Sequence, residues 1–173
     1  DYLIIDLPPG TGDAPLTIAQ TIPITGILVI TTPQDIAMNV AVKAVGMFNK
    51  LNVPIVGVVE NMSYLECPHC KAHVQIFGKG GAQKVSEQFN VPFIGEIPLH
   101  TQIMEGSDTG RPVTVSEPNS MQSLAFSKVA KTIAGRISIL AAEMREQENN
   151  VPSQPESSVS SREADVQQNA SQS

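Results

Sequence analysis

Short runs of hydrophobic residues recur along the first hundred residues, and polar or turn-forming residues flank each of them. The runs are rich in Val, Ile and Leu without alternation. This is typical of strands in a parallel sheet, because helices cover both faces of such a sheet. The sequence therefore predicts four buried parallel strands, at residues 3–5, 27–31, 55–59 and 93–97.

The intervals between these runs carry helical spacing. Apolar residues within 36–51 recur every three or four positions, which predicts an amphipathic helix, and Pro33 and Asp35 stand where helix starts are common. A shorter repeat predicts a second helix at 82–89. The apolar stripe of the first helix consists of Ile36, Val40, Ala44, Phe48 and Leu51, and that of the second of Val85 and Phe89.

A longer helix is predicted over about 119–146, with Asn119 or Ser120 as its N-cap. Beyond it, the composition changes to Ser, Gln, Asn and Glu with almost no apolar residue. Such a segment cannot bury enough surface to offset its loss of conformational entropy. We therefore predict a folded domain at 1–146 and a disordered tail at 147–173.

Strands that alternate with helices at this spacing form right-handed βαβ units. The predicted fold is therefore a doubly wound, mostly parallel α/β sheet. The chain has no initiator Met and opens directly on the first apolar run, which requires burial on both faces. We accordingly expect an N-terminally truncated fold, the later part of a longer protein.

Charge and composition exclude several classes of function. The formal net charge is −6 and no run of Lys or Arg is present, which argues against a nucleic-acid backbone as the main partner. No apolar stretch approaches the roughly 20 residues of a membrane-spanning helix. The two cysteines, three residues apart, do not form a secreted disulfide framework. We expect a cytoplasmic protein, or one of an organelle matrix if an import peptide lies upstream.

Polar residues and glycines follow the predicted strands. In an open α/β sheet the carboxyl ends of the strands meet at one edge, where ligands bind. Asp6 ends the first run and suits Mg²⁺, which takes one or two carboxylates together with phosphates. Gly10 and Gly12 allow the backbone to approach a phosphate. Asn61 is either an adenine-reading amide or a residue that closes a turn.

Gly78-Lys79-Gly80-Gly81 resembles a phosphate loop only superficially, because it does not match G-x-x-x-x-G-K-[ST]. We expect it to open the helix at 82–89.

Cys67 and Cys70 allow three interpretations. A Cys-x-x-Cys pair with His69 between its cysteines is typical of thiol oxidoreductases, although its place after the third parallel strand does not suit their fold. A structural zinc site needs four ligands, and only His69 or His73 stands nearby. An iron–sulfur cluster usually takes four thiolates, which a two-fold dimer would supply.

Several phrases together resemble the Mrp/ApbC family of iron–sulfur cluster carrier ATPases, which are relatives of MinD within the P-loop NTPases. They run in order from residue 1 to about residue 113, and several long phrases in register are more specific than any single motif. The phrases are DYLIIDLPPGTGD, TTPQD, VGVVENMSYLECPHC, IFGKGGAQK, VPFIGEIPL and SDTGRPV.

This resemblance implies an ATP- and Mg²⁺-binding protein. Asp6 would be the Walker B aspartate that organises Mg²⁺. Gly10 would be the switch glycine near the terminal phosphate, and Asp13 would belong to the same switch. Asn61 and Pro98 would lie against the adenine.

The resemblance also implies a cargo. Cys67 and Cys70 would bind a 4Fe-4S cluster that is shared with the same residues of a second subunit in a homodimer. The cluster would pass to apo iron–sulfur proteins, coupled to ATP binding and hydrolysis.

One departure from the family pattern matters. The deviant Walker A loop with its lysines lies upstream of the Walker B strand in this family, and the chain begins after that point. Without that loop, we expect these 173 residues alone to hydrolyse ATP poorly or not at all. Two alternatives remain: a zinc-stapled, MinD-like nucleotide-dependent partitioning module, and a thiol oxidoreductase.

Overall fold

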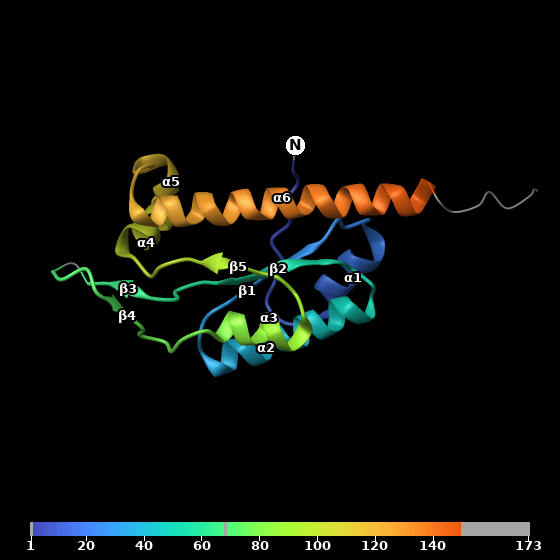
Figure 1. The fold of residues 1–173 in the computed structure, drawn as a ribbon, viewed down its shortest axis with the longest axis horizontal. Coiled ribbons are helices and arrows are strands. Elements are labelled where there is room, and N and C mark those ends of the chain that lie inside the picture. The colour runs from blue at the N-terminus through green and yellow to red at the C-terminus, as the bar shows by residue number, and fades with distance from the viewer. Residues whose placement is uncertain (1, 68, 150–173) are drawn as a thin grey trace, which may run out of the picture.

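A parallel three-stranded sheet lies between two layers of helices in the computed structural model, which describes residues 2–67 and 69–149 (Figure 1). The sheet has the order β1-β2-β5, and a separate antiparallel pair, β3-β4, projects from one end. The elements are α1 (Asp13–Thr21), β1 (Ile27–Thr31), α2 (Asp35–Lys50), β2 (Ile55–Glu60), β3 (Leu65–Glu66), β4 (His73–Val74), α3 (Gly81–Phe89), β5 (Phe93–Glu96), α4 (Thr101–Asp108), α5 (Val113–Ser116) and α6 (Met121–Asn149).

The central strand β2 is buried along its whole length, which explains its continuous run of apolar residues. It pairs in parallel with β1 on one side and with β5 on the other. At its carboxyl end, Glu60 stands opposite Thr31 of β1 and Glu96 of β5. The last residues of the three strands therefore lie side by side.

Each face of the sheet has its own hydrophobic cluster. Helices α2 and α3 pack on one face through Val45, Phe48 and Val85, whereas α6 packs on the other face through Val129 and its neighbours. Figure 1 shows this arrangement, with α6 above the sheet and α2 and α3 below it. No helix in the described part of the chain combines the length and apolar composition that crossing a membrane requires.

Most of the predicted elements are confirmed within one or two residues. The predicted strands at 27–31, 55–59 and 93–97 correspond to β1, β2 and β5, and the predicted helices correspond to α2, α3 and α6. Ser120 is the N-cap of α6, because its Oγ accepts a hydrogen bond from the N–H of Ser123 at 3.3 Å. Gly80 adopts φ +70 as the N-cap of α3, so the glycine-rich segment opens this helix as expected.

The boundary between the long helix and the tail differs from the prediction. Helix α6 continues to Asn149, so residues 147–149 belong to the helix and not to the predicted tail. The remainder of that tail, 150–173, lies outside the described residues, and its disorder stays a prediction.

The predicted strand at residues 3–5 is wrong. Leu3 and Ile4 are 86% and 89% exposed, and no strand is formed there. Among the described residues, no backbone hydrogen bond joins 2–11 to another segment. A strand forms only where a neighbouring strand pairs with it. Among the described residues of the segment 2–11, only Leu7 packs against the hydrophobic core.

Candidate functional site

The carboxyl ends of the three parallel strands are joined by backbone hydrogen bonds. The N–H of Asn61 donates to the carbonyl of Thr31 at 2.7 Å, and the N–H of Ile97 donates to the carbonyl of Glu60 at 2.8 Å. The N–H of Ser63 then donates to the carbonyl of Ile97 at 3.0 Å. The expected gathering of polar segments at one edge of the sheet is therefore confirmed for these three strands.

A cavity of about 490 Å³ runs along the whole of β1 and reaches the carboxyl end of the sheet, and it brings two of the predicted site residues together. Gly10 and Asn61 both line it, with the rest of its wall formed by residues 7–9, strand β1 and one side of α2. Most of the wall is apolar. Its polar side chains are those of Thr31, Thr32 and Asn61, which lie at the carboxyl end of the sheet.

The side chain of Asn61 is held by its own turn. Its Oδ1 accepts a hydrogen bond from the N–H of Met62 at 2.9 Å, and Met62 adopts φ +54, which is uncommon for a residue other than glycine. With Oδ1 engaged, the Nδ2 group remains as a donor toward a ligand in the cavity. The two interpretations of Asn61, turn residue and adenine contact, are therefore compatible.

The glycine segment before α1 is open to a ligand. Gly10 adopts φ +94, and a Cβ at this position would meet no atom within 4 Å. Gly12 is the N-cap of α1 without a side-chain cap, so the first N–H groups of this helix remain available. Both features fit a backbone that approaches a phosphate.

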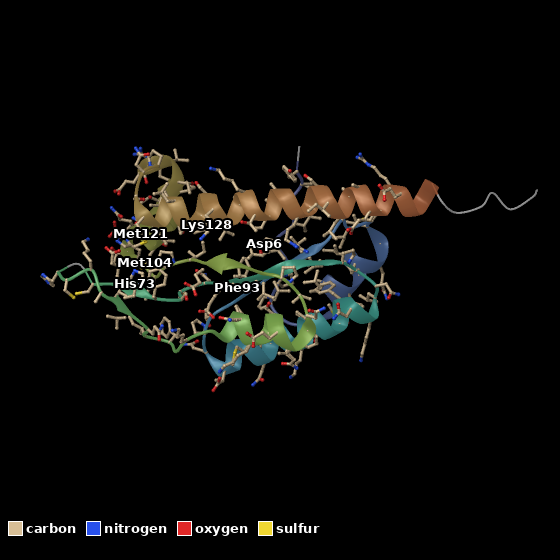
Figure 2. All side chains as sticks on the ribbon, viewed as in Figure 1. Asp6, His73, Phe93, Met104, Met121 and Lys128 are labelled. Carbon is tan, nitrogen blue, oxygen red and sulfur yellow. The ribbon has the colours of Figure 1, made fainter. Side chains whose placement is uncertain are left out.

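The remaining predicted nucleotide residues lie outside the cavity wall. Asp6 and Asp13 are exposed, and Pro98 is buried two residues after the end of β5. His73 belongs to the hairpin at the end of the sheet (Figure 2). Among residues 2–67 and 69–149, no group of three or more His, Cys, Asp or Glu side chains could hold a metal ion.

The cysteines belong to the turn of the β3-β4 hairpin. The N–H of Cys67 donates to the carbonyl of Ala72, and the N–H of Lys71 donates to the carbonyl of Cys67, each at 2.9 Å. Lys71 closes the turn with φ +59. Cys67 is half-buried and Cys70 is exposed, and both are free thiols. The turn therefore presents two sulfur atoms to solvent.

The turn also makes Cys67 more acidic. The backbone N–H of Cys70, then that of His69, and then the thiol of Cys70 lower the pKa of the Cys67 thiol by hydrogen bonding to its sulfur. Partial burial opposes this shift, and the Lys71 ammonium adds to it. A lower thiol pKa increases the fraction of thiolate, which is the form of cysteine that binds metal ions.

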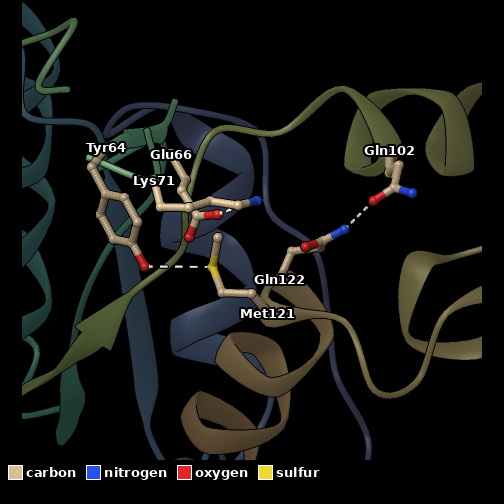
Figure 3. A network of polar contacts seen from close by, with 6 residues as sticks. All are labelled: Tyr64, Glu66, Lys71, Gln102, Met121 and Gln122. Carbon is tan, nitrogen blue, oxygen red and sulfur yellow. Dashed lines mark hydrogen bonds and ion pairs between the residues drawn. The ribbon is translucent and has the colours of Figure 1, made fainter. Parts of the chain in front are cut away.

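The hairpin is attached to the domain through Tyr64. Its ring stacks on His73 with the ring centroids 4.1 Å apart, and its hydroxyl donates to Sδ of Met121 at 3.8 Å (Figure 3). Burial, and then the charges of Glu96 and Glu66, raise the pKa of Tyr64. Its hydroxyl therefore stays protonated and able to donate.

Sequence reasoning missed two residues near the site, Glu60 and Tyr64. Glu60 is 1% exposed at the end of β2, directly before Asn61. A charged residue at the end of an apolar run is a sequence signal for a buried carboxylate with specific hydrogen-bond partners, because burial of such a group without partners costs free energy. The stacking of Tyr64 on His73 depends on strand pairing and has no comparable signal in the sequence.

Comparison with known proteins confirms the resemblance. The ParA family model described as the NUBPL iron-transfer P-loop NTPase matches residues 1–134. An iron-sulfur cluster transfer protein NUBPL of Dictyostelium discoideum is 46% identical over 81% of this chain and 43% of its own length. An iron-sulfur cluster carrier protein of Deinococcus radiodurans is 48% identical over 80% of this chain and 39% of its own length.

The fold is also found among solved structures. A nucleotide-binding protein of Archaeoglobus fulgidus, solved in complex with ADP and with Co, has a TM-score of 0.60 and 40% identity. The match covers 73% of this chain and 50% of that chain. This chain thus spans about two fifths of the curated relatives and half of the solved one. On this sequence and fold similarity, the chain belongs to the NUBPL-type iron-transfer P-loop NTPase family.

Proposed function

We propose that this chain is part of an ATP-dependent carrier that binds a 4Fe-4S cluster and transfers it to apo iron–sulfur proteins. The observation that carries the proposal is the turn at Cys67 and Cys70. It presents two free thiols on a hairpin that projects from one end of the sheet, the end that the cavity reaches. The names of the relatives, which are cluster carrier and transfer proteins, support the same cargo.

The cavity is the proposed site for the nucleoside end of ATP. Asn61 would donate to the adenine, with Pro98 behind it, and the Gly10 backbone would lie near the terminal phosphate. Asp6 would hold Mg²⁺ through its water shell, which needs only one or two carboxylates beside the phosphates. Asp13 would act in the same switch.

A homodimer is the proposed state of the loaded protein. The described part of each chain offers two thiols and no third ligand beside them. Two-fold symmetry would bring a second identical pair to the first, which completes the four thiolates of the cluster. A cluster held in this way would be exposed at the interface and easily released to an acceptor. The cytoplasm or an organelle matrix would suit such chemistry.

Reconstitution of the full-length protein with iron and sulfide under anaerobic conditions tests this function. Cys67→Ala and Cys70→Ala should each abolish bound iron, acid-labile sulfide and the visible absorbance of the cluster. His69→Ala is the matched control, because it keeps the backbone N–H directed at Cys67 and should retain the cluster. Full cluster content in either cysteine variant would defeat the ligand assignment. One zinc per chain without labile sulfide would favour the zinc-stapled module instead.

A further inference from the structure

Glu60 is a buried carboxyl group that the proposed chemistry does not use. It is 1% exposed at the end of the central strand. Its Oε1 accepts a hydrogen bond from Ser63 Oγ at 2.6 Å, and its Oε2 accepts one from the N–H of Ala82 at 2.9 Å. A buried acid costs free energy that an apolar residue would avoid. The two hydrogen bonds offset this cost, which indicates that Glu60 has a structural role.

These contacts join three separate parts of the domain. Ser63 begins the arm that leads into the hairpin, and Ala82 belongs to the first turn of α3. Next to Ala82, Gly81 packs so closely on the loop after β1 that a Cβ would lie 2.9 Å from Cα of Pro33. One side chain therefore connects the end of β2, the start of α3 and the arm of the cysteine hairpin.

The arm is continuously bonded from Ser63 to the cysteine turn. The N–H of Ser63 donates to the carbonyl of Ile97 at 3.0 Å, and the N–H of Leu99 donates to the carbonyl of Tyr64 at 2.7 Å. Leu65 then bridges in parallel to Leu99. Beyond it, the hairpin pairs up to the N–H of Cys67. A displacement of Ser63 would therefore be transmitted along this arm to the Cys67–Cys70 turn.

The hydrogen bond between Glu60 and Ser63 is also connected to the cavity. Asn61, which lines it, stands between Glu60 and Ser63 in the chain. Met62 joins them with φ +54, a conformation that persists only where the surroundings hold it. The Ser63–Glu60 hydrogen bond closes this short loop, so the cavity wall and the hairpin arm share one buried contact.

We propose that Glu60, acting through Ser63, is a positioning residue that fixes the Cys67–Cys70 turn relative to the nucleotide cavity, so that the two sites move as one unit. The identity of the two ligands rests on the proposed function, whereas the mechanical connection rests on the contacts above. A nucleotide that contacts Asn61 would act directly on the segment that carries Cys67.

Hydrogen exchange measured by mass spectrometry tests the connection in the full-length protein, with and without ADP. The variant Ser63→Ala removes one oxygen atom and no apolar contact, so the fold should remain. Without ADP, exchange should rise about tenfold at 61–67 and 72–74, as expected for loss of one buried hydrogen bond. With ADP, the wild type should show a change in exchange at 67–72 that Ser63→Ala has lost.

Ser123→Ala is the matched control. Ser123 is 1% exposed, and its Oγ is within hydrogen-bonding distance of the Val113 and Glu117 carbonyls, so the loss is comparable. Among the described residues, no hydrogen bond joins Ser123 to Glu60 or Ser63. Exchange in Ser123→Ala should rise only near α5 and the start of α6. An unchanged hairpin in Ser63→Ala, an equal rise over the whole chain, or an ADP effect retained in that variant would overturn the proposal. If ADP changes nothing in the wild type, the nucleotide assignment fails, and the ADP-free comparison still decides whether Glu60 positions the turn.

Discussion

At the scale of single residues, the end of strand β2 separates a buried side chain from one that lines the cavity. Glu60 is the last residue of β2 and is buried, whereas Asn61, the next residue, lines the cavity. The sequence selects Asn61, Cys67 and Cys70 as candidates from their side-chain chemistry, and their roles as ligands stay predictions. The sequence also contains the signal for Glu60, a charged residue that ends an apolar run, but not its partner Ala82, which lies 22 residues away.

The acidity of Cys67 leads to a prediction about its reactivity. An ordinary cysteine thiol has a pKa of about 8.5. Because N–H groups of the turn lower the pKa of the Cys67 thiol, Cys67 should form its thiolate at a lower pH than an ordinary cysteine. In metal-free protein, iodoacetamide should therefore modify Cys67 with a rate midpoint below that ordinary value. Peptide mass spectrometry of samples alkylated at several pH values measures this midpoint.

Lys71→Met provides the control for that measurement. Removal of the ammonium should move the midpoint upward by only a small amount, because the N–H groups contribute more than Lys71 does. A midpoint at or above the ordinary value in the wild type would contradict the turn geometry.

At the scale of elements, close packing of the loop after β1 on the start of α3 supports the site. A Cβ at Gly81 would lie 2.9 Å from Cα of Pro33 and 3.0 Å from Met38. We predict that Gly81→Ala lowers the free energy of unfolding by about 1–3 kcal/mol, as overpacking does. Urea unfolding followed by circular dichroism measures the change, since the chain has no Trp.

Gly135→Ala is the matched control for Gly81→Ala. Gly135 is exposed within α6, and a Cβ there would meet no atom within 4 Å. The substitution should raise the free energy of unfolding by about 0.5–1 kcal/mol, because Ala restricts the unfolded chain and favours the helix. Equal effects of the two substitutions would show that the contact between Gly81 and Pro33 is loose.

Helices and strands were predicted correctly from the sequence where their pattern lies within the element itself. The prediction failed where an element depends on a distant partner strand. The spacing within 36–51 defines α2 by itself, because one face of a helix repeats within the helix. The run at 3–5 has the composition of a strand, but membership of a sheet depends on a neighbour that the run does not specify. The two-residue strands β3 and β4 are too short for any periodicity, and their pairing became visible only in the structure.

At the scale of the whole molecule, the three layers place the cysteine hairpin outside the packed core. The sheet and its helices bury the two hydrophobic clusters, whereas the hairpin projects from one end of the sheet (Figure 1). A turn in this position can approach an identical turn without disturbing the core.

This position leads to a prediction about assembly. If two thiols per chain are half of a ligand set, loading the full-length protein with iron and sulfide should convert monomers into dimers that contain four iron atoms. Sedimentation velocity before and after anaerobic loading measures the mass, and an iron chelator should return the protein to monomers. Cys67→Ser should remain monomeric under the same conditions, whereas His69→Ala should dimerise as the wild type does. A loaded protein that sediments as a monomer, or that holds all four iron atoms within one chain, would show that the ligand set is completed by other means.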